Sequence, residues 1–114
     1  MIQHVFRALV WEHSPGDPGS WHFVTVPAEL SEDLVLEAGP RSGLGSIRVE
    51  ASIGSTTWQT SVFPDAASGG FVLPLKKQVR RAEELLAGSS CDVTLEVIER
   101  GSTDPRREDR SRLR

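Results

Sequence analysis

Four cationic side chains fall within six consecutive positions and are the residues best suited to chemistry: Lys76, Lys77, Arg80 and Arg81. The surrounding pattern predicts that they occupy the start of a helix over 75–87. None of the residues at its beginning, 73–75, is Ser, Thr, Asp or Asn, so no side chain is expected to cap its first N–H groups. Free N–H groups beside cations predict an anion-binding site for a small anionic ligand, such as a phosphate, or for an acidic protein surface.

A solvated face is the competing interpretation of this cluster, because runs of charge usually face water. Glu83 and Glu84 follow Arg80 at the i+3 and i+4 spacings that form ion pairs on a helix. Nucleic acid is the narrower form of the anion hypothesis. It is disfavoured but stays open, because residues 1–100 contain 8 basic and 13 acidic side chains, a net charge of −5.

Large aromatic residues are numerous for a chain of 114 residues, with three Trp and four Phe. Aromatic side chains in strands mostly belong to the core, where each buries a large apolar area. The alternative is that some of them line a pocket for a small ligand at the mouth of a barrel, with Trp21 and Trp58 as the candidates.

Patterns for catalysis and for metal binding are weak. His4, His13 and His22 lack the spacings of zinc-binding motifs, and the chain has a single cysteine. His13, Ser14 and Asp17 share one loop rich in Pro and Gly, which would not hold a catalytic triad rigidly. We therefore expect no catalytic residues, no metal, no cofactor and no enzymatic activity.

The elements that must position these residues are mainly strands. Alternating apolar residues and turn signals predict two short helices, over 27–38 and 75–87, and six strands, over 4–11, 21–26, 47–53, 56–63, 71–73 and 93–97. Gly54-Ser55 predicts a two-residue hairpin with a type II′ turn. This composition predicts a mostly β fold, a small six-stranded split barrel in which the helices plug the open ends.

A faint internal repeat accompanies this order of elements. At an offset of 49 residues, four positions match in character: Val24, Val26, Leu30 and Gly39 fall on Leu73, Leu75, Val79 and Gly88. The match predicts two halves of ββαβ order. Chance is the alternative, because the spacing of such elements alone aligns apolar positions.

The length of the chain predicts one domain over 1–100, followed by an Arg-rich tail over 101–114 that we expect to be disordered. No apolar run is long enough to span a membrane. The lone Cys91 precludes a disulfide within the chain, so we expect a protein of the reducing cytoplasm, either a monomer or a homodimer.

Two sequence steps resemble a known family: W-x-F-V-x-V-P at 21–27, and the passage from strand to basic helix at 73–81. With FRALVW near the N-terminus and DVTLEV near the end, residues 3–98 resemble the bacterial family named domain of unknown function 1905. The resemblance implies a split β-barrel related to AbrB-like and MazE-like barrels, with no established activity. One departure is that Ser89–Cys91 separates Gly88 from Asp92, where the family has a tight Gly-Asp step.

These observations together favour a non-enzymatic binding or interaction domain that contacts an anionic partner through the basic helix start. AbrB-like barrels bind DNA as dimers, so the resemblance makes a DNA-binding regulator, similar to an antitoxin, the first alternative. A small-molecule binder that uses the barrel mouth near Trp21 and Trp58 is the second.

Overall fold

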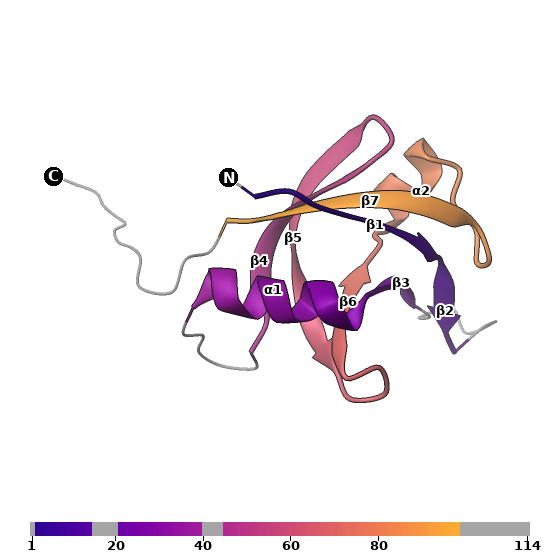
Figure 1. Cartoon of the computed structure of the whole chain (residues 1–114). Helices are drawn as coiled ribbons and strands as arrows, with labels where there is room; N and C mark the ends of the chain where they lie inside the picture. Colours follow the sequence, from indigo (N-terminus) through magenta and orange to yellow (C-terminus); the bar gives the residue numbers. More distant parts are fainter. Residues whose placement is uncertain (1, 15–20, 40–44, 99–114) are drawn as a thin grey trace, which may run out of the picture.

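The computed structural model describes residues 2–14, 21–39 and 45–98. Nine elements follow one another along the chain: β1 (His4–Leu9), β2 (Trp11–His13), β3 (Trp21–Val26), α1 (Ala28–Ala38), β4 (Ile47–Ile53), β5 (Thr56–Asp65), β6 (Gly70–Pro74), α2 (Lys77–Ala82) and β7 (Ser90–Val97). The strands form one antiparallel sheet in the order β1-β7-β4-β5-β6-β3-β2, which curls into a half-barrel (Figure 1). The predicted mostly β fold is confirmed.

The predicted number of strands is wrong, because the first expected strand divides into β1 and β2 at Val10. β1 pairs with β7, whereas β2 pairs with β3. Between them, the N–H of Val10 donates to the Ser89 carbonyl at 2.8 Å, and its carbonyl accepts from the Gly88 N–H at 2.7 Å. β1 and β2 are the two ends of the sheet, so this buried residue joins the ends of the curl.

Strand pairing relates the two halves of the chain to each other. β3 and β6 pair with Val24 opposite Leu73, residues that are 49 positions apart. β4 and β7 also pair with one another. β5 lies between β4 and β6, while the divided first strand contacts β7 through β1 and β3 through β2. Four pairings therefore join residues 4–53 to residues 56–97: β1 with β7, β3 with β6, β4 with β5 and β4 with β7.

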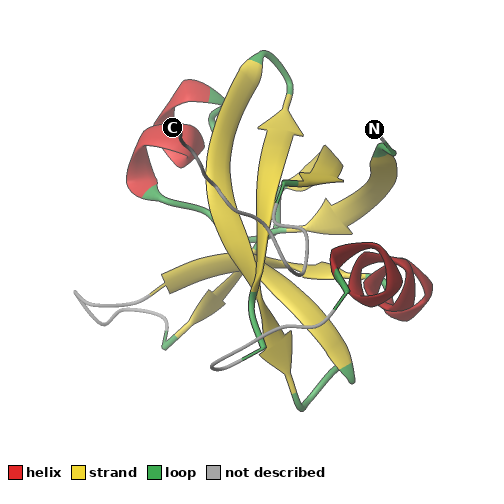
Figure 2. Ribbon diagram, turned by 90° about the vertical axis from the view of Figure 1, so that its left-hand side faces the viewer, coloured by secondary structure: helices red, strands yellow, loops and turns green. Residues whose placement is uncertain are grey.

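The first helix, α1, agrees with its predicted bounds to within one residue. Pro27 precedes it with φ −56°, and Gly39 ends it with φ +74°, a backbone conformation that glycine adopts without steric cost. Leu34 and Ala38 are buried, and the helix packs against β4, β6 and β7. In Figure 2 the two helices lie on opposite sides of the curled sheet.

The second helix, α2, is shorter than the predicted 75–87, because it ends in a Schellman motif. Leu85 N–H donates to the Arg80 carbonyl at 2.8 Å, and Glu84, with φ +55°, is the left-handed residue of the motif. The turn carries Leu85 into the core, whereas Leu86 is 73% exposed. Leu86, which is spaced to share an apolar helix face with Leu75, Val79 and Ala82, therefore does not belong to the core.

The hairpin between β4 and β5 has the predicted two-residue turn. Ile53 pairs with Thr56, and Gly54 has φ +59°, while Ser55 does not have a positive φ, as a type II′ turn requires. A Cβ atom at Gly54 would meet the carboxylate of Glu83. The turn therefore requires the glycine, and a side chain there would also have to displace the Glu83 carboxylate.

Two predictions concern residues that the structure does not describe. The Arg-rich tail over 101–114 and Asp17 of the His13–Asp17 loop lie outside the described residues. Within the described ranges, no helix has the length and apolar character that crossing a membrane needs.

Candidate anion-binding surface

The cationic residues are positioned by two buried neighbours. Leu75 follows β6, and its N–H donates to the His22 carbonyl at 2.9 Å. Val79 is buried one turn later and fixes α2 against the core. Because Leu75 and Val79 face inward, Lys76, Lys77 and Arg81 are turned to solvent.

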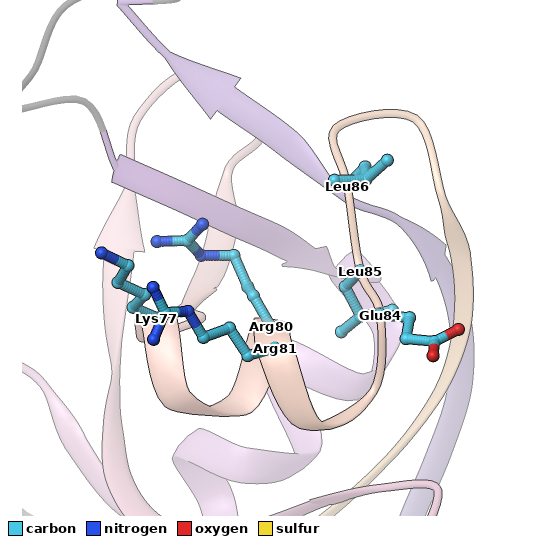
Figure 3. A pocket seen from close by; sticks show the side chains of 6 residues that line it. All are labelled: Lys77, Arg80, Arg81, Glu84, Leu85 and Leu86. Atoms are coloured by element: carbon cyan, nitrogen blue, oxygen red, sulfur yellow. The ribbon is translucent and has the colours of Figure 1, made fainter.

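Three of the four predicted cations, Lys77, Arg80 and Arg81, line one hollow of about 320 Å³, which we call the cationic hollow. Its other lining residues are Glu84, Leu85 and Leu86. Figure 3 shows the end groups of Lys77, Arg80 and Arg81 extending to the same side of α2, while the carboxylate of Glu84 extends to the other. The half-buried Arg80 is oriented by its Nε, which donates to the Leu75 carbonyl at 3.0 Å. Its other guanidinium nitrogens remain available to an anion.

The expected neutralisation of this cluster by neighbouring acids is absent. Glu83 instead accepts a hydrogen bond of 2.5 Å from Thr56 Oγ1, in the hairpin between β4 and β5. In the part of the chain that the structure describes, Lys76, Lys77 and Arg81 form no ion pair. The solvated-face interpretation therefore rests on the exposure of these side chains alone.

The predicted contribution of the helix start is smaller than the sequence suggested. Lys76, rather than a residue of 73–75, is the N-cap, and no side chain caps α2. With only six residues, α2 aligns few peptide dipoles. The attraction for an anion therefore comes from the side chains and not from the helix terminus.

The two tryptophans of the predicted pocket do come together. They line a cavity of about 180 Å³, the tryptophan cavity: Trp21, Trp58, Gln59, Thr60, Pro74, Leu75 and Lys76. Trp58 is 9% exposed, whereas Trp21 is 60% exposed. Lys76 lines this cavity, and the next residue in the chain, Lys77, lines the cationic hollow. The two separately predicted sites are thus neighbours.

A third hollow was not predicted from the sequence. The aromatic hollow, of about 390 Å³, is lined by His13, Trp21, Phe23, Phe63, Val72 and Pro74. The alternation along β3 indicates this hollow, because Trp21 and Phe23 lie on the face of the strand opposite to that of the buried Val24 and Val26. Of these residues, only Trp21 was predicted from the sequence as a candidate for a pocket.

Ring contacts fix the aromatic side chains of this face. The rings of Trp21 and Phe23 are stacked, with centroids 6.2 Å apart and an interplanar angle of 13°. Trp11 packs on the same Phe23 at 5.0 Å, and its Nε1 donates to Thr25 Oγ1 at 3.0 Å. Trp21 is therefore the exposed end of an ordered row of aromatic rings.

The other residues that could do chemistry, the histidines and the cysteine, are not arranged as a reactive or metal-binding group among the described residues. His4 Nε2 lies 2.8 Å from Glu37 Oε1, and both side chains are buried. Burial raises the pKa of the Cys91 thiol, and the nearby Asp92 carboxylate raises it further, which opposes formation of a nucleophilic thiolate. Among the described residues, no three His, Cys, Asp or Glu side chains are grouped as metal ligands.

The curled antiparallel sheet with two short helices defines a class of small, mostly β domains. Within that class, the chain belongs to the family described as domain of unknown function DUF1905, whose model matches residues 6–95. This confirms the resemblance found in the sequence. No curated protein matches the chain.

Proposed function

We propose that this chain is a non-enzymatic binding domain that contacts an anionic partner through its cationic surface: Lys76, Lys77, Arg80 and Arg81. One observation carries the proposal. Lys77, Arg80 and Arg81 line a single hollow, and no acid of the described residues forms an ion pair with them.

Electrostatic repulsion within α2 supports this proposal. Lys77 and Arg81 are spaced i,i+4, and Lys77 and Arg80 are spaced i,i+3, so like charges are neighbours on one helix face. Such pairs destabilise a helix by about 0.2–0.5 kcal/mol each. A bound anion offsets this repulsion and forms charge-assisted hydrogen bonds with the arginines. The arrangement therefore suits binding better than it suits stability.

The finer architecture is part of the proposal. We infer that the curled sheet is a split barrel built from two ββαβ halves, residues 4–53 and residues 56–97. The second strands of the two halves, β3 and β6, pair with each other, and so do the last strands, β4 and β7. The first strand of each half pairs with the last strand of the other, β1 with β7 and β5 with β4. A chain that supplies both halves has less need of a second copy to complete its sheet. This argues for a monomeric binder over the dimeric DNA-binding regulator, and the net charge of −5 over residues 1–100 points the same way.

The test is a calorimetric titration of the full chain with pyrophosphate at low and at high salt. We expect measurable affinity that falls steeply as salt screens the charges. The double variant Lys77→Glu/Arg81→Glu should abolish it. The matched control Arg7→Glu/Arg48→Glu changes the net charge equally at exposed positions of β1 and β4, and should bind nearly as the unaltered chain does. Equal binding by both double variants would show that α2 is only a solvated face.

A further inference from the structure

We propose that the anionic partner is a free nucleoside phosphate, with its base stacked on Trp21 and its phosphates bound by Lys76, Lys77 and Arg81. The inference rests on the proposed function, because it names the chemistry of the ligand that the cationic surface would bind.

The first argument is that an aromatic ring and a cation line the same cavity. The aromatic hollow and the tryptophan cavity share Trp21 and Pro74. The tryptophan cavity then reaches Lys76, and the next residue, Lys77, lines the cationic hollow. The lining of the tryptophan cavity therefore includes both an exposed aromatic ring, Trp21, and a cation, Lys76. A nucleotide has the same division between a planar aromatic base and a charged phosphate group.

The second argument is the state of Trp21. A tryptophan that is 60% exposed leaves a large apolar area in water. Its ring does not need to be ordered on binding, because stacking on Phe23 already holds it, and Trp11 holds Phe23 from the other side. A preorganised side chain loses little conformational entropy when a ligand binds. Stacking on an exposed aromatic ring is the common way in which proteins hold an unpaired base.

The third argument is charge, and it selects a free nucleotide over a nucleic-acid strand. Four of the 8 basic residues of 1–100 are confined to positions 76–81. The 13 acidic residues of the same range would repel the phosphates of a long polyanion wherever it extended beyond this cluster. A ligand with one base and a few phosphates places all its charge on the cluster.

Calorimetry of the full chain with ADP and with its two fragments, adenosine and pyrophosphate, tests the inference. We expect ADP to bind at least about tenfold more tightly than pyrophosphate, because the base adds a stacking contact. Adenosine alone should bind weakly, and its affinity should change little with salt.

Three variants separate the parts of the site. Trp21→Ala should reduce the affinity for ADP about tenfold and leave that for pyrophosphate unchanged. Trp21→Phe should restore most of the lost affinity, because it keeps an aromatic face. The control is Leu9→Ala, which removes an exposed apolar side chain of β1 that lines none of the three hollows. It should leave ADP binding intact.

The outcomes also separate this inference from the proposed function. If pyrophosphate binds in a way that needs Lys77 and Arg81, but ADP binds no better and Trp21→Ala has no effect, the nucleotide inference fails and the proposed function stands. If pyrophosphate binds equally to the Lys77→Glu/Arg81→Glu variant, both fail. Much tighter binding of a single-stranded oligonucleotide than of ADP would overturn the choice of a free nucleotide.

Discussion

The two helices of the chain differ in whether one of their charged side chains is paired with another element. α1 has 11 residues, and its buried Glu37 is engaged by His4, a residue of β1. α2 has six residues, and Lys77 and Arg81 have no acid partner among the described residues. The contrast lies in Glu37, whose contact with His4 ties α1 to β1, because the exposed acids of α1 form no ion pair among the described residues either.

Burial explains how each helix is held. α1 buries Ser31, Leu34 and Ala38. The Ser31 hydroxyl accepts from the Phe71 N–H at 3.2 Å and contacts the Val26 carbonyl at 3.4 Å, so it links the helix to β3 and β6. α2 buries Val79 alone, with Leu75 and Leu85 just outside its ends. A helix held by so few contacts leaves most of its surface to the solvent.

The largest expected effect tests the structural role of α1. Leu34→Ala removes a fully buried side chain and should lower the free energy of unfolding by about 2–5 kcal/mol. Leu36→Ala, on the same helix but at a position that is 80% exposed, is the matched control and should have almost no effect. Urea denaturation measures both. Similar losses would show that α1 is not held by its buried face.

The second effect tests the internal pairing of charge at α1. His4→Ala removes the imidazole from a buried Glu37 carboxylate 2.8 Å away, and should cost about 1.5–3 kcal/mol, the range for a hydrogen bond to a charged group. Denaturation at neutral pH measures the loss. His13→Ala, at an exposed residue of β2, is the control. A negligible loss at His4 would mean that charge at α1 is no more engaged than charge at α2.

The third effect tests how Glu83 is kept away from the cations of α2. Gly54→Ala and Gly69→Ala both place a side chain at a positive φ, but only at Gly54 would the new Cβ meet Glu83. The alanine should displace that carboxylate from Thr56, so Gly54→Ala should cost about 1 kcal/mol more than Gly69→Ala. The released Glu83 is spaced i+3 from Arg80, so pyrophosphate affinity should fall as well. Equal effects of the two variants would remove Glu83 from the explanation.

Local patterns predicted most of the strands and α1, because alternation, Pro27, Gly39 and Gly54 act within a few residues. They did not predict the end of α2. Gly88 is the usual signal for a helix end, but the chain turns at Glu84, where the burial of Leu85 outweighs the cost of a left-handed non-glycine residue. Tertiary contacts decide such a competition, and a sequence window does not contain them.

The same distinction applies to the candidate site. The cationic cluster was found in the sequence because its members are adjacent. Its lack of acid partners was not, because Glu83 is drawn away by Thr56, 27 positions earlier in the chain. The proximity of Trp21, Trp58 and Lys76 likewise depends on three segments that the sheet brings together.

The smallest expected effect has the opposite sign and is the most direct test of the comparison. Arg81→Gln removes one of two like charges at i,i+4 and should raise the free energy of unfolding by about 0.2–0.5 kcal/mol at low salt. Arg7→Gln, which removes an exposed cation paired with Asp92, is the control and should not stabilise the chain. Added salt should erase the gain, because it screens the repulsion that the substitution removes. A gain in stability with a loss of pyrophosphate affinity would mean that α2 keeps its charge for binding, at the expense of stability. A loss of stability would mean instead that Arg81 supports the fold, and the contrast between the two helices would no longer hold.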